Sequence, residues 1–147
     1  MNIFFDGRWP QQKRFEQYAQ DVLNHFFKNR LKREVDIHLR LVPKQTDLGY
    51  CSGDKNEVVI ELARNNDGKR IPINELAQTL AHELVHAKQF IRGEINDVNY
   101  MYGKKDYSSA SYRQQPWEHE AYMMEDFLYK LYWENRRYLK LTYEVFQ

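Results

Sequence analysis

The segment AHELVHAKQF, residues 81–90, contains two histidines four positions apart, His82 and His86, with Glu83 directly after the first. In an α-helix, residues at this spacing lie one turn apart on the same face. Two neutral imidazoles placed in this way can bind one zinc ion. Glu83 lies beside that face, where it can take a proton from a water molecule at the metal instead of binding the metal itself.

The residues around this segment predict a helix that borders a buried surface. The helix is expected to start at Asn74, which can cap it, and to run to about Ile91, with Gly93 just past its end. One apolar stripe follows the helical period and consists of Leu76, Leu80, Leu84, Ala87 and Ile91. The histidines lie on a neighbouring face, which favours a metal site over a chance pair of surface histidines.

The preceding segments predict a helix and two strands. Residues 10–31 have apolar side chains at helical spacing. Residues 34–43 and 57–62 alternate apolar and polar side chains, which is typical of half-buried strands, and we expect the two to pair antiparallel. Residues 47–56 and 65–72 have the composition of turns and loops.

Length, charge and cysteine content limit the class of protein. The 147 residues are a usual length for one domain, residues 1–147, and the net charge of +1 gives no bulk attraction to nucleic acid or anionic membranes. Cys51 is the single cysteine, so an intrachain disulfide is excluded and a reducing compartment is expected. The sequence contains neither a signal-peptide pattern nor a membrane span. These features together predict a cytoplasmic protein.

Two histidines leave a metal incompletely coordinated, so a further ligand is expected from a later element. The segment QQPWEHEAYMMED, residues 114–126, predicts a helix starting near Pro116. The apolar face of this helix consists of Trp117, Ala121, Met124, Leu128 and Leu131. Glu118 and Glu120 flank that face on opposite sides, and His119 points away from it. The period alone leaves both glutamates open, and acids in a first helical turn also interact well with the helix dipole.

The HELVH segment resembles the active-site helix of zincin metallopeptidases, which has uncharged residues around its histidines. Lys88 departs from the apolar residue usual at that position, and the third histidine of metzincins is absent. In gluzincins the third zinc ligand is a glutamate on a later helix, commonly in a Glu-x-x-Ala setting. Residues 118–121, EHEA, match this pattern with Glu118 as the ligand. Glu120 is the second candidate and His119 the third, because SprT-like relatives use a third histidine.

The order of the predicted elements also resembles the minimal gluzincin scaffold. Over about residues 34–130 the chain is similar to small SprT-like or ImmA/IrrE-like peptidases, particularly the stand-alone versions carried by bacteriophages, which combine HELVH with a PWE-x-EA segment. The resemblance implies an α+β, minimal zincin-like domain. Its small antiparallel sheet would pack on an N-terminal helix, an HExxH helix and a long C-terminal glutamate helix. For a phage protein, the expected location is the host cytoplasm.

This resemblance implies a hydrolase that cleaves peptide bonds in a peptide or protein substrate. Zn²⁺ bound by His82, His86 and Glu118 would activate water, with Glu83 as general base. The alternative is a zincin-like regulatory or DNA-associated module with restricted or no peptidase activity. The chain has no zinc ribbon or dense basic stripe that would favour this alternative. The oligomeric state is left open.

Three supporting roles complete the expected site. A donor that steadies the oxyanion is expected among Tyr102, Tyr107, Tyr112 and Arg113. A histidine ligand needs a partner on its other ring nitrogen, and Tyr122 and Glu125 are the candidates. The strand 57–62 could offer an unpaired edge to an extended substrate.

Overall fold

The computed structural model describes residues 1–28, 31–96, 101–102, 105–106 and 115–135. The strands are β1 (Asn2–Asp6), β2 (Asp36–Val42), β3 (Gly49–Gly53), β4 (Glu57–Ala63), β5 (Asn65–Asn66), β6 (Lys69–Arg70), β7 (Ile95–Asn96), β8 (Met101–Tyr102) and β9 (Lys105–Asp106). The helices are α1 (Gln12–Phe27), α2 (Ile73–Ile91) and α3 (Pro116–Tyr129), and α3 continues into a π-helical segment, Lys130–Glu134. The main sheet has the strand order β1-β2-β4-β3, beside two small sheets, β5-β6 and β7-β8-β9.

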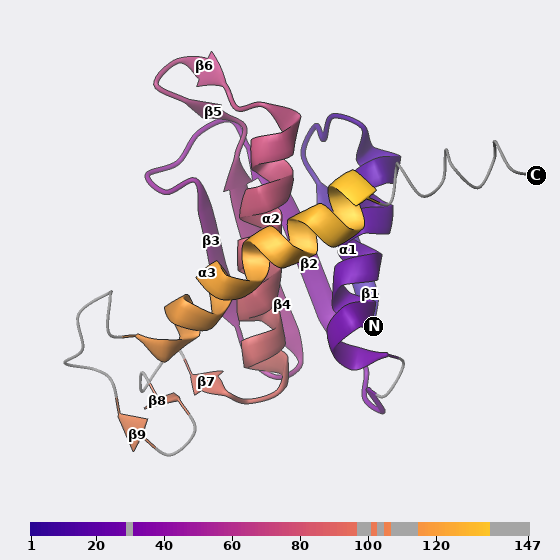
Figure 1. Cartoon of the computed structure of the whole chain (residues 1–147), viewed down its shortest axis with the longest axis vertical. Coiled ribbons are helices and arrows are strands. Elements are labelled where there is room, and N and C mark those ends of the chain that lie inside the picture. The colour runs from indigo at the N-terminus through magenta and orange to yellow at the C-terminus, as the bar shows by residue number, and fades with distance from the viewer. Residues whose placement is uncertain (29–30, 97–100, 103–104, 107–114, 136–147) are drawn as a thin grey trace, which may run out of the picture.

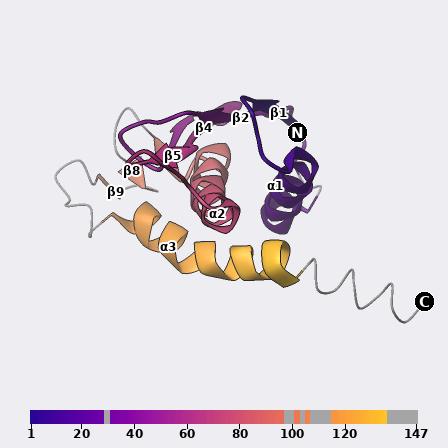
Figure 2. The same ribbon diagram turned by 90° about the horizontal axis from the view of Figure 1, so that it is seen from above.

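The described elements form three layers. The main sheet is the first layer, α1 and α2 lie side by side against one of its faces, and α3 crosses them on the side away from the sheet (Figures 1 and 2). A mixed sheet with helices on one side agrees with the predicted α+β class. No helix within the described ranges has the length and apolarity that crossing a membrane requires.

The antiparallel pairing predicted for the two main strands is wrong. β2 and β4 run parallel, with Ile37 beside Val58 and Leu39 beside Ile60. Parallel neighbours cannot be joined by a tight hairpin, so the chain between them must cross over. Between β2 and β4 the chain first forms β3, which pairs antiparallel with the other side of β4. The sheet is therefore mixed rather than antiparallel.

The segment predicted as a turn, residues 47–56, contains the edge strand β3, and a tight turn follows this strand. There, Asp54 Oδ1 accepts hydrogen bonds from the backbone N–H groups of Asn56 at 2.7 Å and Glu57 at 2.9 Å. An aspartate that binds the backbone two and three residues ahead stabilises a tight turn. The strand has a glycine at each end and no fully buried side chain, so its sequence lacks the alternation that reveals β2 and β4.

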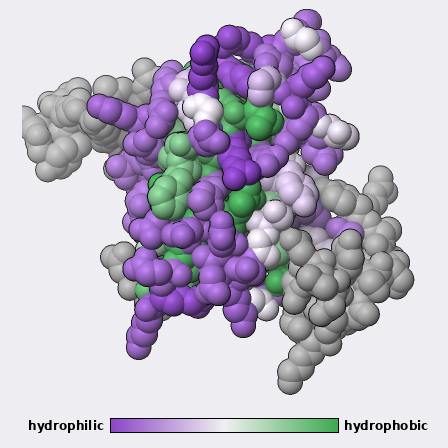
Figure 3. All heavy atoms as spheres, turned by 180° about the vertical axis from the view of Figure 1, so that it is seen from behind, coloured by the Kyte–Doolittle hydropathy of each residue, from purple (hydrophilic) through white to green (hydrophobic). Residues whose placement is uncertain are grey.

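The predicted alternation of β2 and β4 is confirmed. The inward side chains are fully buried under α1 and α2, namely Ile37, Leu39, Val58, Ile60 and Leu62. On the outer face, His38 lies 3.3 Å from Glu57 and Arg40 lies 3.6 Å from Glu61. Figure 3 shows this face, on which hydrophilic side chains surround scattered hydrophobic ones.

Trp133, in the π-helical segment, fixes the far end of the α3 layer. Its indole N–H donates a hydrogen bond to Asn74 Oδ1 at 2.8 Å, and its ring packs against Phe15 and Tyr18 of α1. The side chain of Asn74 thus binds Trp133 and does not cap α2, which begins after Pro72. This contact joins the C-terminal end of the α3 layer to α1 and α2.

Candidate metal centre

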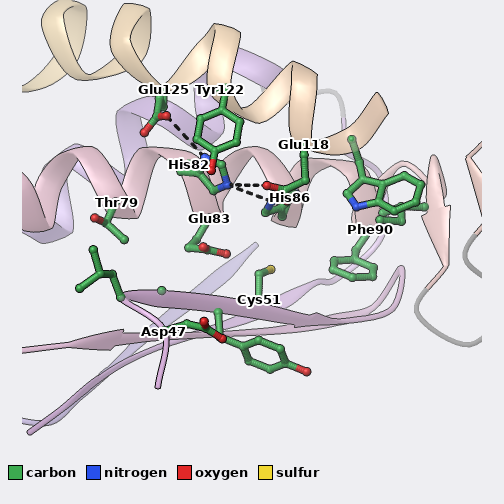
Figure 4. A pocket seen from close by; sticks show the side chains of 15 residues that line it. Asp47, Cys51, Thr79, His82, Glu83, His86, Phe90, Glu118, Tyr122 and Glu125 are labelled. Atoms are coloured by element: carbon green, nitrogen blue, oxygen red, sulfur yellow. Dashed lines mark hydrogen bonds and ion pairs between the residues drawn. The ribbon is translucent and has the colours of Figure 1, made fainter. Parts of the chain in front are cut away.

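Helix α2 presents the two histidines toward α3 and Glu83 toward β3 (Figure 4). The Nε2 atoms of His82 and His86 are 3.2 Å apart, and the ring planes meet at 80°. Both side chains are largely buried, with 12% and 10% of their surface exposed. The predicted helical spacing therefore brings the two ring nitrogens to a common point.

Glu118, in the first turn of α3, reaches the same point. One of its carboxylate oxygens lies 2.5 Å from His86 Nε2, and the other lies 3.3 Å from His82 Nε2. The three side chains each offer one donor atom, and these atoms all lie within 4.8 Å of one another. His82, His86 and Glu118 could therefore hold a metal ion.

The spacing of these donors fits a small tetrahedral ion. With metal–ligand bonds of about 2.0–2.1 Å, tetrahedral donors lie about 3.3–3.4 Å apart. The separation between the two histidine nitrogens, 3.2 Å, is close to this value, and so is the 3.3 Å between His82 Nε2 and Glu118 Oε2. The 2.5 Å contact of His86 Nε2 is with the other Glu118 oxygen, Oε1. It has the length of a short hydrogen bond and would have to lengthen by under 1 Å if that oxygen were the ligand.

The other two candidates for the third ligand lie elsewhere. Glu120 Oε1 accepts hydrogen bonds from Lys88 Nζ at 2.8 Å and from Gln89 Nε2 at 3.0 Å. Burial alone raises the pKa of Glu120, but Lys88 and Gln89 outweigh it and lower the pKa below its ordinary value. His119 is exposed. Of the three candidates, the structure brings Glu118 to the histidines.

Glu83 is a buried carboxyl between α2 and β3, with 6% of its surface exposed. It approaches the strand so closely that a Cβ atom on Gly49 would lie 2.9 Å from Glu83 Oε1. Burial raises the pKa of Glu83, and the neighbouring imidazoles only partly offset this. A carboxyl with a raised pKa can both accept and return a proton near neutral pH.

Each histidine has a partner on its second ring nitrogen. Glu125 Oε1 lies 3.7 Å from His82 Nδ1, and the ring of Tyr122 packs edge-on against His82 at 4.8 Å between centroids. Of the two predicted candidates for this role, Glu125 lies at the ring nitrogen, and the contact of Tyr122 is with the face or edge of the ring. The partner of His86 is Gln89, 2.7 Å away, which the sequence analysis missed. The sequence feature that could have identified Gln89 is its position: it is an uncharged polar residue three positions after His86 on a largely apolar helix.

The surrounding carboxylates favour positive charge at the two histidines. Burial alone lowers the pKa of His82, but Glu118, Glu125 and Glu83 outweigh it and raise the pKa to about 10. The pKa of His86 is raised for the same reason, with Glu118 as the main contributor against burial. An environment that stabilises a proton on these rings also stabilises a metal cation between them.

The donors open into a cavity of about 540 Å³ between β3, α2 and α3. Phe90, Ile95 and Trp117 line it beyond His86, and Leu48 and Tyr50 of the β3 side line it opposite Glu83. Among the predicted oxyanion donors, Tyr107, Tyr112 and Arg113 lie outside the described residues, and Tyr102 is described only in its backbone.

No model of a known protein family matches this chain, and no curated protein sequence matches it either.

Proposed function

We propose that this chain is a zinc-dependent peptidase of the gluzincin type. His82, His86 and Glu118 would bind the metal, and Glu83 would act as general base. The observation that carries the proposal is the convergence of three donor atoms within 4.8 Å beside the buried carboxyl of Glu83. Two imidazoles and one carboxylate form a ligand set typical of catalytic zinc sites, which keep a fourth position open.

Each residue of the site then has a defined chemical task. When bound, zinc supplies a Lewis acid that polarises the scissile carbonyl and lowers the pKa of water. The Glu83 carboxylate takes the proton from the attacking water and passes it to the leaving amine nitrogen. Its raised pKa favours this exchange, because the carboxyl must hold the proton between the two transfers. Glu125 and Gln89 keep the two imidazoles turned toward the metal.

The edge of the sheet next to the site is an observation in favour of a peptide as the substrate. The strand first considered for this role, residues 57–62, is unsuitable because β4 is paired with β2 on one side and β3 on the other. Within the described sheet β3 is the edge strand beyond β4, and its residues Gly49–Cys51 line the cavity that contains Glu83. An extended peptide could add to this edge through backbone hydrogen bonds, with its scissile bond facing the metal.

The decisive experiment combines metal content with hydrolysis. The wild type is expected to bind one zinc ion per chain by elemental analysis and to cleave members of a quenched fluorescent peptide library. Glu83→Gln should keep the zinc and lose hydrolysis, whereas His82→Ala should lose both. Glu75→Gln, an exposed change in the first turn of the same helix, is the matched control and should behave as wild type.

Three results would count against the proposal. A wild type that binds no zinc would remove its basis, and full hydrolysis by Glu83→Gln would remove the general base. Zinc binding without cleavage of any library peptide would favour the regulatory module over the peptidase.

A further inference from the structure

Gln89 is a fully buried polar residue where α2 meets α3, with no exposed surface. It lies one helical turn after His86, and its side-chain oxygen is 2.7 Å from His86 Nδ1. Its amide nitrogen donates one hydrogen bond to the backbone oxygen of Trp117 at 2.9 Å and another to Glu120 Oε1 at 3.0 Å. One amide group thus joins a metal-site histidine to two residues of α3.

The partners of Gln89 determine which way its amide faces. A backbone carbonyl and a carboxylate can only accept hydrogen bonds, so the atom facing Trp117 and Glu120 must be the NH₂ group. The atom facing His86 is then the amide oxygen, which can only accept. His86 must therefore carry a proton on Nδ1, and its Nε2 lone pair is left for the metal. This nitrogen is also the one that faces Glu118 and His82.

The same hydrogen bonds fix the position of Glu118. Trp117 and Glu120, the two α3 partners of Gln89, lie on either side of Glu118 in the first turn of the helix. Lys88 strengthens the connection, because its ammonium group bridges Glu120 and Glu94 at 2.8 Å each. A shift of the first turn of α3 would have to break these buried and part-buried contacts, so the Glu118 carboxylate is held against the histidines.

We propose that Gln89 is a positioning residue of the metal centre, with two linked effects. It selects the form of His86 that binds metal through Nε2, and it sets the first turn of α3, and with it Glu118, against α2. The inference rests on the proposed metal site. The two histidines are supported differently, since the partner of His82 is the carboxylate of Glu125. An amide orients His86 without adding a negative charge.

The test compares two replacements of Gln89 with a control on the same helix. Gln89→Met keeps an unbranched side chain of similar size and removes every hydrogen bond of the side chain. Gln89→Glu keeps an oxygen that accepts from His86 but sets a carboxyl group against Glu120 and the Trp117 carbonyl. Gln78→Met makes the methionine change at a half-buried position of α2 that does not line the cavity. Zinc affinity is measured by chelator competition and stability by melting of the metal-free protein.

We expect Gln89→Met to lose about 10–100-fold in zinc affinity, the usual cost of removing the partner of a histidine ligand. Gln89→Glu should lose less affinity although its melting temperature falls at least as far, because it retains the acceptor for His86 but places two acids together. A residue that only packs would lower affinity in step with stability. In the zinc-loaded wild type, ¹⁵N NMR should show the His86 proton on Nδ1.

Three results would overturn the inference. They are unchanged zinc affinity in Gln89→Met, affinity losses that follow melting temperature across both variants, or zinc binding of His86 through Nδ1. Failure of the wild type to bind zinc would overturn the proposed function together with this inference, whereas the three results above leave the metal site standing. The Gln78→Met control should match wild type in affinity.

Discussion

A single methyl group added at Gly49 would test how closely the edge strand approaches the general base. A Cβ atom there would lie 2.9 Å from Glu83 Oε1, 3.0 Å from Glu83 Cγ and 2.8 Å from Thr79 Cγ2. Carbon contacts are ordinarily about 3.5–4.0 Å long. Gly49→Ala therefore requires the Glu83 side chain or β3 to move by roughly half an ångström or more. The backbone of Gly49 does not have positive φ, so the effect is one of space and not of backbone strain.

The displacement should separate catalysis from metal binding. Misplacing a catalytic group by about 1 Å can cost about 100-fold in rate, so we expect Gly49→Ala to lose about tenfold in kcat. Overpacking should also lower the free energy of unfolding by about 1–3 kcal/mol. Zinc affinity should stay near the wild-type value, because the three proposed ligands lie on α2 and α3 and none is among the close contacts of the added atom.

The assay is peptide cleavage under saturating substrate, together with chelator competition for zinc. Ser52→Ala, a small change further along the same strand, is the control and should retain the wild-type kcat. Wild-type turnover in Gly49→Ala would show that Glu83 does not depend on this approach. A loss of zinc affinity as large as the loss of rate would show that the change disturbs the whole site.

Three further predictions concern the third ligand, the metal-free state and the anchor of α3. Glu118→Ala should weaken zinc binding at least about tenfold, or about 1.4 kcal/mol, and Glu120→Ala should weaken it less; chelator titration giving the reverse order would assign the ligand to Glu120. In the metal-free protein, His82 has a pKa of about 10 against an ordinary value of 6.5, so its stabilising effect is complete below about pH 6.5 and is lost as pH rises through about 10. The melting temperature should fall over that range, and His82→Ala should weaken this dependence, because the pKa of His86 is also raised and still contributes. Trp133→Ala should lower the free energy of unfolding by about 3–5 kcal/mol in denaturant titrations, because it empties a buried aromatic site and leaves Asn74 without its indole donor.

Most of the secondary structure that could be predicted from the sequence followed from the local spacing of apolar residues. Helix α2 and the inward faces of β2 and β4 follow from spacing along the chain, which is a local property. The direction of pairing between β2 and β4 is not local, because it depends on where β3 inserts. The strand β3 itself, with the sequence GYCSG, escapes detection because an edge strand beside a cavity needs no buried alternation.

The candidate site shows the same division between local and tertiary information. The i, i+4 histidines were evident, but the sequence could not separate Glu118 from Glu120 by spacing. Lys88 separates them in the structure, since its buried ammonium group binds Glu120. Lys88 is also the residue that departs from the apolar pattern of the zincin helices that this segment resembles.

The departure at Lys88 therefore has a physical explanation. Two carboxylates in one helical turn, both near a buried surface, would repel each other and compete for one cation. Lys88 gives Glu120 its own positive partner, with Glu94 as a second acid on the same ammonium group. Glu118 is then the acid of the pair that faces His82 and His86. A lysine at this position would support the proposed metal centre indirectly, because it pairs with Glu120 while Glu118 faces the histidines.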